Sequence, residues 1–314
     1  MEQKPLVVVN GLVRKDAIAY LKEHVEVRQW TEKTVMPRET LKEWLVDADG
    51  LWCVRPLDVD GDLVKNAPNL KVIAQAAVGY DNVNIDELTA AGIPYGNTPG
   101  VLNETVAELA FTLIATASRR ILENANFVKE GRWAQRPSNI KGFDLSRRTL
   151  GIIGMGAIGV SISRRARAFG MTVVYHNRNQ RIDDKIHKTT YMELDDLLAT
   201  SDVVCVMAPL TDETYHMCDE AFFKKMKNTA LFVNVGRGPI VDTDALINAL
   251  KTGEIDYAAL DVTDPEPLPA DHPLLEVENC LIVPHIGSYT DRTRYDCWCS
   301  EETVKDLCKR RSEL

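Results

Sequence analysis

The sequence predicts an α/β protein with two doubly wound domains, a larger one in the second half of the chain and a smaller one at its start. Two observations support this fold class. Short apolar runs recur along the chain with helical or loop segments between them, and one of these runs leads directly into a glycine-rich stretch at residues 150–159. At 314 residues, the chain is long enough for two domains that each bury a core.

The first hundred residues contain the smaller set of predicted strands, at residues 6–9, 25–28, 51–54 and 72–75. A long helix is predicted next, at residues 105–119, because its apolar residues follow the i, i+3, i+4 rhythm. Thr105 and Glu108 have the spacing of a capping box at its start. Residues 124–148 are polar, and we expect them to lack strand or long-helix structure and to form either a subunit-contacting arm or a loop.

The second half of the chain supplies six further apolar runs, at residues 150–154, 172–176, 202–207, 230–235, 257–262 and 280–283. Six strands of this kind, separated by helices, fit a doubly wound parallel sheet. After residue 287, a helical stretch is predicted to run nearly to the end of the chain.

Three glycines with the spacing G-x-G-x-x-G follow the first of these six runs. In this pattern Gly154 permits a tight turn, Gly156 lets the backbone approach phosphate groups, and Gly159 lets the helix at residues 160–169 pack close to the sheet. The N-terminus of that helix presents free N–H groups to an anion. Because a strand precedes the glycines and another follows the helix, the context predicts a Rossmann-type dinucleotide-binding domain.

The end of the second strand bears on cofactor choice. An Asp or Glu about 20 residues past the first glycine usually binds a free ribose 2′-OH, but here the strand ends in His176-Asn177-Arg178-Asn179-Gln180-Arg181. Asn177 can form hydrogen bonds without repelling an anion, and Arg178 and Arg181 suit a 2′-phosphate. We therefore expect a preference for NADP(H), with NAD(H) as the alternative cofactor. The competing interpretation is that both arginines are solvated surface.

Composition and charge argue against several classes of partner. The chain has 46 acidic and 37 basic residues, a formal net charge of −9, and no basic block, so neither nucleic acid nor a membrane is expected as a partner. No apolar stretch reaches membrane-spanning length, and a cytoplasmic protein is expected. The seven cysteines lie mostly in apolar runs, which favours reduced, buried thiols over disulfides, and no metal site is expected.

Three residues suited to redox chemistry follow three of the predicted strands. Ligands of doubly wound sheets bind beyond the carboxyl ends of the strands, where the sequence places Arg237, Glu266 and His285. A guanidinium can bind the carboxylate and carbonyl oxygens of a 2-oxo acid, and a histidine can donate a proton to the carbonyl. A neighbouring carboxylate would stabilise the protonated imidazole and orient its ring. Taken singly, Glu266 could also be a loop charge and His285 a turn residue.

The chain resembles the D-isomer-specific 2-hydroxyacid dehydrogenase family over nearly its whole length. The resemblance is carried by residues 77–82, 97–100, 105–108, the glycine stretch, and residues 209–214, 233–238, 260–268 and 284–288. It implies a dinucleotide-binding domain at residues 101–287 and a smaller flavodoxin-like substrate domain at residues 1–100 plus 288–314, in a homodimer. It also implies that Arg237, Glu266 and His285 are catalytic and that the backbone amides of Val78 and Gly79 bind the substrate carboxylate.

Further roles come from the resemblance alone. Arg55 matches a position that in some members faces the distal group of the substrate, Asp261 would lie near the nicotinamide carboxamide, and Thr105 near the cofactor phosphates. The full set of cofactor contacts that we expect is Thr105, Gly154, Met155, Gly156, Ala157, Ile158, Gly159, Asn177, Arg178, Arg181, Ala208, Pro209, Thr214, Val235, Gly236, Asp261, His285 and Gly287.

Within the family, the ending of the second strand resembles that of NADPH-using glyoxylate and hydroxypyruvate reductases. The resemblance therefore implies reduction of a small 2-oxo acid, such as glyoxylate, hydroxypyruvate or 2-ketogluconate, to the D-2-hydroxy acid. Residues 289–314 depart from the family pattern, which leaves the substrate open. The alternatives are oxidation of a D-2-hydroxy acid or phosphite with NAD, and a corepressor-like scaffold that senses dinucleotides.

Overall fold

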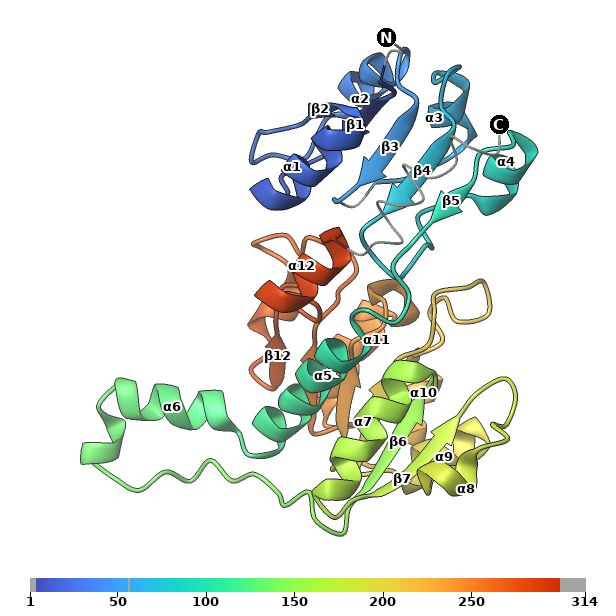
Figure 1. Ribbon diagram of the computed structural model, residues 1–314. Helices are drawn as coiled ribbons and strands as arrows, with labels where there is room; N and C mark the ends of the chain where they lie inside the picture. The colour runs from blue at the N-terminus through green and yellow to red at the C-terminus, as the bar shows by residue number, and fades with distance from the viewer. Residues whose placement is uncertain (1–3, 56, 300–314) are drawn as a thin grey trace. The chain divides into compact units, whose positions relative to one another are not determined.

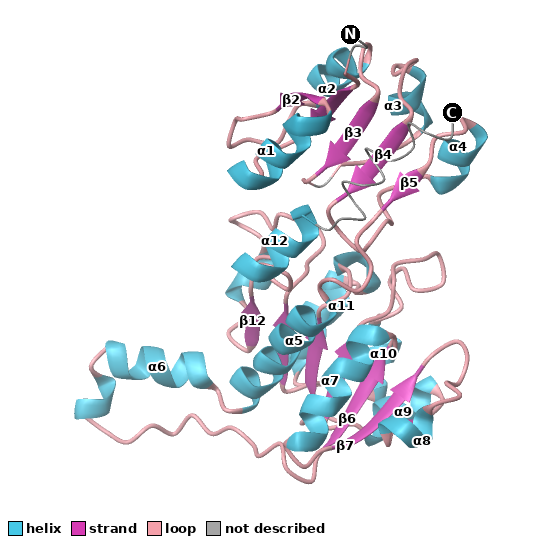
Figure 2. Cartoon of the chain, in the orientation of Figure 1, coloured by secondary structure: helices cyan, strands magenta, loops and turns pink. Residues whose placement is uncertain are grey.

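The protein is described by a computed structural model that covers residues 4–55 and 57–299. The chain divides into two compact units, each built on one parallel sheet (Figure 1). Unit 1 comprises Met1–Leu102 and Thr290–Leu314, and unit 2 comprises Asn103–Tyr289. In both units helices alternate with strands along the chain (Figure 2). The predicted α/β class with two parallel sheets is confirmed.

Unit 1 contains a five-stranded parallel sheet with the strand order β2-β1-β3-β4-β5. This is the order of flavodoxin-like folds, as predicted. The strands are β1 (Leu6–Val9), β2 (Glu26–Gln29), β3 (Gly50–Cys53), β4 (Val72–Gln75) and β5 (Tyr95–Gly96). The helices are α1 (Lys15–His24), α2 (Arg38–Leu45), α3 (Gly61–Lys65), α4 (Ile85–Ala90) and α12 (Asp291–Cys299). The sequence did not predict β5, a two-residue edge strand.

Apolar clusters cover both faces of the unit 1 sheet. Side chains alternate between the two faces along each strand, so successive residues of one strand belong to different clusters. Leu51 and Cys53 of β3 belong to the apolar cluster that contains residues of α2, whereas Trp52 belongs to the cluster that contains residues of α1. Trp298 of α12 packs against this second cluster. The C-terminal helix therefore completes the core of a unit that the N-terminal residues begin.

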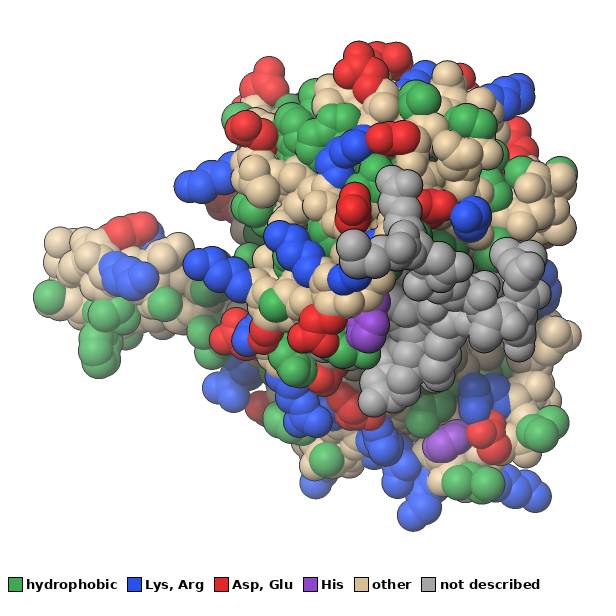
Figure 3. Space-filling view, turned by 45° about the horizontal axis from the view of Figure 1, so that its top comes forward, with side chains coloured by type: hydrophobic (Ala, Val, Ile, Leu, Met, Phe, Trp, Pro, Cys, Tyr) green, Lys and Arg blue, Asp and Glu red, His purple; other side chains and the backbone are tan. Residues whose placement is uncertain are grey.

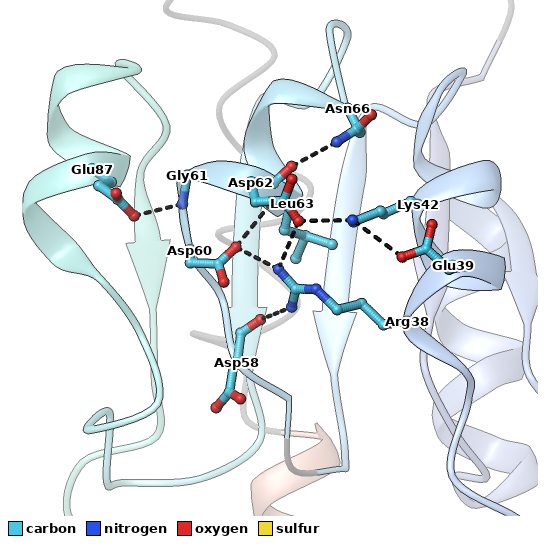
Figure 4. A network of polar contacts seen from close by, with 10 residues as sticks. All are labelled: Arg38, Glu39, Lys42, Asp58, Asp60, Gly61, Asp62, Leu63, Asn66 and Glu87. Carbon is cyan, nitrogen blue, oxygen red and sulfur yellow. Dashed lines mark hydrogen bonds and ion pairs between the residues drawn. The ribbon is translucent and has the colours of Figure 1, made fainter.

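A network of charges fixes the loop between β3 and α3, which carries Arg55 (Figure 4). Arg38 of α2 donates to the Asp58 carbonyl at 2.9 Å and to Asp60 Oδ1 at 2.5 Å. Asp60 is the N-cap of α3 and accepts from the Leu63 N–H at 2.9 Å. Asp60 thus links α2 to the start of α3. Through Arg38, α2 holds the loop between β3 and α3 at Asp58 and at Asp60.

Unit 2 contains a seven-stranded parallel sheet with the strand order β12-β11-β10-β9-β6-β7-β8. The strands are β6 (Thr149–Ile153), β7 (Thr172–His176), β8 (Thr190–Tyr191), β9 (Val203–Val206), β10 (Leu231–Asn234), β11 (Tyr257–Leu260) and β12 (Cys280–Ile282). Read from β8, this is the Rossmann order with one strand added, which confirms the predicted fold. The strand β8 was not predicted. The order reverses between β6 and β9, where ligands of such sheets bind.

The helices of unit 2 cover both faces of its sheet, whose central strands β9, β10 and β11 are buried throughout. They are α5 (Asn103–Ser118), α6 (Ile121–Lys129), α7 (Ala157–Ala168), α8 (Asp184–His187), α9 (Leu194–Thr200), α10 (Glu220–Lys225) and α11 (Thr243–Thr252). Three short 3₁₀ turns also occur: η1 (Arg132–Ala134), η2 (Gly238–Ile240) and η3 (Pro273–Glu276).

The start of α5 corrects one prediction. The helix begins at Asn103, two residues before the expected start, so Thr105 lies in its first turn and does not cap it. Glu108 instead pairs with Arg165 of α7 at 3.2 Å, and Glu104 accepts from Arg165 at 3.0 Å. The acidic residues near the start of α5 therefore hold it against α7.

A segment after α5 projects from the body of unit 2 (Figure 1). The expectation that residues 124–148 lack long-helix structure was partly wrong, because α6 occupies the first of them. Phe127 of α6 is buried under the guanidinium of Arg132, 4.7 Å from its ring centre, which gives the segment its own small packing centre. We call residues 121–143 the arm. Figure 3 shows hydrophobic side chains in green on the projecting lobe. The exposed large apolar residues of the arm are Ile121, Leu122, Val128 and Trp133.

Other sequence expectations concern cysteines, metals and membranes. Five free cysteines lie in the described residues, four buried and Cys280 half-buried, as expected for reduced thiols. Cys299 and Cys308 lie where side chains are not described, as does the end of the helix predicted after residue 287, of which α12 is the described part. Residues 4–55 and 57–299 hold no cluster of three His, Cys, Asp or Glu side chains suited to a metal, and none of their helices is long and apolar enough to span a membrane.

Candidate active site

The three glycines of the motif have different surroundings in the turn from β6 to α7. Gly154 has φ +99°, and a methyl group placed on it would lie 2.5 Å from the Ala208 nitrogen. A methyl group on Gly159 would lie 2.9 Å from the Gly154 carbonyl oxygen. Only glycine fits both positions, the first because of its conformation and the second because α7 packs against the loop. A methyl group on Gly156, in contrast, meets no heavy atom within 4 Å.

The open space at Gly156 is what a dinucleotide diphosphate requires. Gly156 and Ala157 are exposed, and α7 begins at Ala157. The first N–H groups of a helix, here those of Ala157 and Ile158, have no acceptor within the helix and carry its positive dipole end. Together with the free approach at Gly156, they form a site suited to an anion such as a diphosphate. The residues present therefore fit a dinucleotide.

The polar residues after β7 fold back on the glycine loop. Asn177 Oδ1 accepts from the Met155 N–H at 2.6 Å, so this N–H is already engaged. Arg181 donates to both carboxylate oxygens of Asp183, at 2.8 and 2.6 Å, and to the Met155 carbonyl at 3.0 Å. Arg178 is exposed, and no hydrogen bond or ion pair joins it to any residue within 4–55 and 57–299. The sequence suggested the two arginines as equivalent. In the structure Arg181 is held by Asp183 and the Met155 carbonyl, whereas Arg178 is exposed.

The loop after β9 lies beside the glycine loop at the point where the strand order reverses. Ala208 is nearly buried and contacts Gly154. The Thr214 hydroxyl donates to the Pro209 carbonyl at 2.7 Å and accepts from the Thr211 N–H at 2.8 Å. Thr214 therefore closes this loop into a turn. Its hydroxyl has a structural role in addition to the cofactor contact that the resemblance implies.

Arg237 follows β10 on a turn that the buried residue Asn234 organises. Asn234 Oδ1 accepts from the Gly236 N–H at 3.0 Å, and its Nδ2 donates to the Arg237 carbonyl at 2.9 Å. A methyl group on the next glycine, Gly238, would lie 1.9 Å from the Thr263 carbonyl oxygen. The Arg237 turn is thus in close contact with the turn after β11, which carries Glu266. Asn234 was missed in the sequence because an amide at a strand end is a common feature.

Glu266 and His285, from the turns after β11 and β12, meet directly. His285 Nδ1 lies 2.5 Å from Glu266 Oε1. Burial raises the pKa of Glu266, but the hydrogen bond and charge of His285, the Thr263 N–H and the charge of Arg237 lower it, and the net pKa lies below the ordinary value. The structure brings all three strand-end residues to neighbouring turns of one sheet edge. With Nδ1 held by the carboxylate, Nε2 is the imidazole atom left for proton transfer.

Asp261, at the end of β11, holds the turn on which His285 lies. Its carboxylate accepts from the Ile286 N–H at 2.7 Å and the Gly287 N–H at 2.9 Å, and the His285 N–H donates to its carbonyl at 2.9 Å. His285 has φ +51°, a conformation that side chains rarely adopt. Asp261 is 2% exposed, and burial raises its pKa against the opposing effect of these N–H groups. Asp261 thus fixes the position of His285.

Gly287 and Thr105 also lie in unit 2. A methyl group on Gly287 would come within 3.5 Å of Val106, the residue after Thr105 in α5. Val235, beside Gly236, donates to the Val206 carbonyl at 3.3 Å. These expected cofactor contacts therefore line the same edge of the sheet as the glycine loop and the catalytic turns.

The expected substrate contacts of unit 1 follow β3 and β4. The Arg55 N–H donates to Asn10 Oδ1 at 3.2 Å, and Asn10 Nδ2 donates back to the Arg55 carbonyl at 3.2 Å. This reciprocal pair fixes the backbone of Arg55. Val78 and Gly79 lie on the loop after β4, and both are half-buried.

Comparison with known proteins identifies the family. A family model described as the NAD binding domain of D-isomer specific 2-hydroxyacid dehydrogenases matches residues 111–287. A glyoxylate reductase of Korarchaeum cryptofilum is 42% identical over 294 residues, which cover 93% of this chain and 89% of that protein. Glyoxylate/hydroxypyruvate reductase B of Escherichia coli is 42% identical over 295 residues, covering 93% and 91%.

Solved structures give the same result. The TT0316 protein of Thermus thermophilus has a TM-score of 0.90 at 38% identity, covering 96% of this chain and 95% of that chain. An NADPH-dependent glyoxylate/hydroxypyruvate reductase of Sinorhizobium meliloti, in complex with NADP and malonate, has a TM-score of 0.88 at 29% identity, covering 99% and 94%. D-lactate dehydrogenase of Aquifex aeolicus, with NAD and lactic acid, has a TM-score of 0.85 at 30% identity, covering 98% and 95%.

The fold and the glycine loop define an oxidoreductase with an NAD(P)-binding domain in unit 2. The chain belongs to the D-isomer-specific 2-hydroxyacid dehydrogenase family.

Proposed function

We propose that the protein reduces a small 2-oxo acid to the D-2-hydroxy acid with NADPH, and that glyoxylate, hydroxypyruvate or 2-ketogluconate is the substrate. The contact between His285 and Glu266, beside the Arg237 turn, carries this proposal because it supplies a proton donor held by a carboxylate. The names of the relatives support the first two substrates. Residues 1–100 plus 288–314, which nearly coincide with unit 1, are proposed as the substrate domain, and residues 101–287 as the dinucleotide-binding domain.

In the proposed reaction, a bound nicotinamide dinucleotide supplies the hydride that reduces the carbonyl carbon. Arg237 binds the carboxylate and carbonyl oxygens through its planar guanidinium and so orients the carbon. His285 gives its Nε2 proton to the carbonyl oxygen, which becomes the hydroxyl of the product. Glu266 stabilises the protonated imidazole before the transfer and keeps its ring oriented through Nδ1.

The proposed preference for NADPH rests on Asn177 and Arg178. The Asn177 side chain at the end of β7 carries no charge that would repel a 2′-phosphate, and Arg178 is exposed beside it. Arg181 is held by Asp183 and is a weaker candidate for direct contact, although its charge adds to the local positive potential. The relative that was solved with NADP is consistent with this choice.

Initial rates with glyoxylate, hydroxypyruvate and 2-ketogluconate, each with NADPH and with NADH, test the proposal. His285→Ala is the control for background reduction. Arg178→Ala should weaken the binding of NADPH by about 1.5–3 kcal/mol, or roughly 10- to 150-fold in Kd, and leave the binding of NADH nearly unchanged. Arg181→Ala is the matched variant, and because its contacts are to Asp183 and Met155 it should weaken NADPH binding less than Arg178→Ala does. Equal losses of both cofactors in Arg178→Ala contradict the phosphate contact.

The same experiment separates the alternatives. Turnover of D-2-hydroxy acids or phosphite with NAD, and none in the reductive direction with any pair, favours NAD-dependent oxidation as the function. The D-lactate dehydrogenase relative solved with NAD would then be the better guide. No turnover in either direction, with dinucleotide binding retained, favours a dinucleotide-sensing scaffold.

A homodimer is also proposed, with the arm as part of the interface. Large apolar side chains of the arm lie in solvent, with Trp133 67% exposed and Ile121 51% exposed. An interface with a partner would remove this apolar area from water. A second copy of the chain is the partner that the family resemblance implies. The free cysteines fit the reducing environment of the cytoplasm, which is the proposed location.

A further inference from the structure

The loop after β4 is held in one orientation by the segment that follows β5. The Ala77 carbonyl accepts from the Thr98 N–H at 3.0 Å, and the Val78 carbonyl accepts from Asn97 Nδ2 at 2.8 Å. Both peptide bonds are trans, because cis bonds in the described residues precede only Pro265 and Pro267. In a trans peptide the N–H points opposite to the carbonyl. The N–H groups of Val78 and Gly79 therefore point away from residues 97 and 98.

A second amide fixes the next peptide of the same loop. Gln75, at the end of β4, is 7% exposed, and its Nε2 donates to the Gly79 carbonyl at 2.7 Å. The same side chain forms a reciprocal pair with Asn82, at 3.3 Å from Nε2 to Oδ1 and 3.2 Å from Asn82 Nδ2 to Oε1. Asn82 Nδ2 also donates to the Leu57 carbonyl at 2.5 Å. Because Gln75 is nearly buried, its orientation is set by the protein and not by solvent.

The N–H groups of Val78 and Gly79 are turned away from the residues that hold the carbonyls of this loop. Three successive carbonyls, from Ala77 to Gly79, have donors, but no acceptor within residues 4–55 and 57–299 receives either N–H. Both residues are half-buried. Two adjacent N–H groups turned to the same side form a concave site that suits the two oxygens of a carboxylate.

We propose that Asn97 and Gln75 are positioning residues for the substrate carboxylate. Neither touches a substrate atom. Asn97 holds the Val78 carbonyl, whose peptide carries the Gly79 N–H, and Gln75 holds the Gly79 carbonyl of the next peptide, so the loop keeps the Val78 and Gly79 N–H groups turned toward the carboxylate before it binds. This inference rests on the proposed function and deepens it, since it assigns the motif at residues 97–100 a role in substrate binding. The carboxylate keeps its charge throughout hydride transfer, so the loop binds the ground state and the transition state alike.

Two variants test the proposal. Asn97→Ala removes the donor to the Val78 carbonyl and adds no charge. Gln75→Glu keeps the acceptor for Asn82 but replaces the donor to the Gly79 carbonyl by a carboxylate. Asn69→Ala is the matched control, because Asn69 Nδ2 donates to the Val46 carbonyl at 3.2 Å elsewhere in unit 1. For each protein, the measurements are KM and kcat for glyoxylate, the Kd of NADPH by fluorescence titration, the Tm, and the Kd of malonate by calorimetry.

Asn97→Ala should raise KM for glyoxylate and the Kd of malonate by about 3- to 10-fold, the effect of one backbone-fixing hydrogen bond. The kcat, the Kd of NADPH and the Tm should stay close to the wild-type values, as they should in Asn69→Ala. Gln75→Glu should show the larger increase in KM near about pH 7.5, and this increase should shrink toward about pH 5.5, where a buried carboxyl regains a proton that it can donate to Gly79.

Other results overturn the proposal. An unchanged KM and malonate Kd in both variants shows that the two amides do not position the loop. A parallel loss of kcat, NADPH affinity and Tm shows a merely structural role. If the wild-type protein binds malonate but reduces no 2-oxo acid, the proposed function fails while the malonate series still decides the role of Asn97 and Gln75. Failure of the wild type to bind malonate rejects the carboxylate site itself.

Discussion

Replacing Glu266 by Gln should move the alkaline limit of the reductase reaction to lower pH. The change keeps the size of the side chain and an oxygen acceptor for His285 Nδ1, but it removes the negative charge 2.5 Å from that atom. Both side chains are partly exposed, at 39% for Glu266 and 48% for His285, so solvent screens the pair. For charges about 4 Å apart, Coulomb's law gives about 1 kcal/mol in water and about 4 kcal/mol at an effective dielectric constant of 20.

Exposure favours the lower part of this range, about 1–2 kcal/mol, which corresponds to a shift of about one pH unit. The sign follows from the Glu266 pKa, which His285 lowers: the two partners of the pair stabilise each other, so loss of the carboxylate charge should move the alkaline limb of the reaction to lower pH. The assay is kcat/KM for the 2-oxo acid between about pH 5 and pH 10, at saturating NADPH. An alkaline limb that stays at the wild-type pH refutes the reasoning, and the Tm of the variant shows whether it is folded.

Three further predictions address the cofactor site, stability and assembly. Gly156→Ala should leave the Tm within a few degrees of the wild type, because a Cβ at this position meets no heavy atom within 4 Å, yet it should weaken NADPH binding about tenfold by occupying the space of the diphosphate; unaltered NADPH binding by fluorescence titration contradicts this. Asp202→Asn should lower the free energy of unfolding at neutral pH by about 1–3 kcal/mol in urea titrations, since its carboxylate accepts from the Thr149 N–H at 2.9 Å and from Lys227 at 3.1 Å. The Thr149 N–H and nearby cations lower the Asp202 pKa against the effect of burial, so the deficit should be present above about pH 4 and disappear as the pH falls through the lowered pKa. Leu122→Asp, on the exposed face of the arm, should convert a dimer to a monomer in light scattering; a dimer that withstands this charge places the interface elsewhere.

The sequence predicted the long and buried elements of the fold and missed the short ones. The central strands of unit 2 are uninterrupted apolar runs, which the helices on both faces require. The edge strands β5 and β8 are two residues long and contain no pattern from which to predict them. The helix α6 was missed because the segment judged polar, residues 124–148, begins inside the helix and leaves out Ile121 and Leu122. Its packing centre also depends on Arg132 stacking over Phe127, a contact made after the helix ends.

The same distinction holds for the candidate site. The positive φ of Gly154 and the close packing at Gly159 follow from local spacing, which a sequence shows directly. The difference between Arg178 and Arg181 does not, because it depends on Asp183 turning back to pair with one of them. The amides of Asn97 and Gln75 were missed for a related reason, since they act on backbone groups and no side-chain pattern marks that kind of contact.

Unit 1 is made from both ends of the chain, which affects its synthesis. The ribosome releases β1 to β5 first, then all of Asn103–Tyr289, and only afterwards α12 with Trp298. At typical elongation rates this interval is about 10–40 s, and unit 2, being continuous, can fold within it. During that time the apolar cluster of unit 1 that contains Val7, Val9 and Leu21 lacks Trp298, which later packs against it. We therefore expect nascent chains stalled before residue 290 to recruit chaperones through this face.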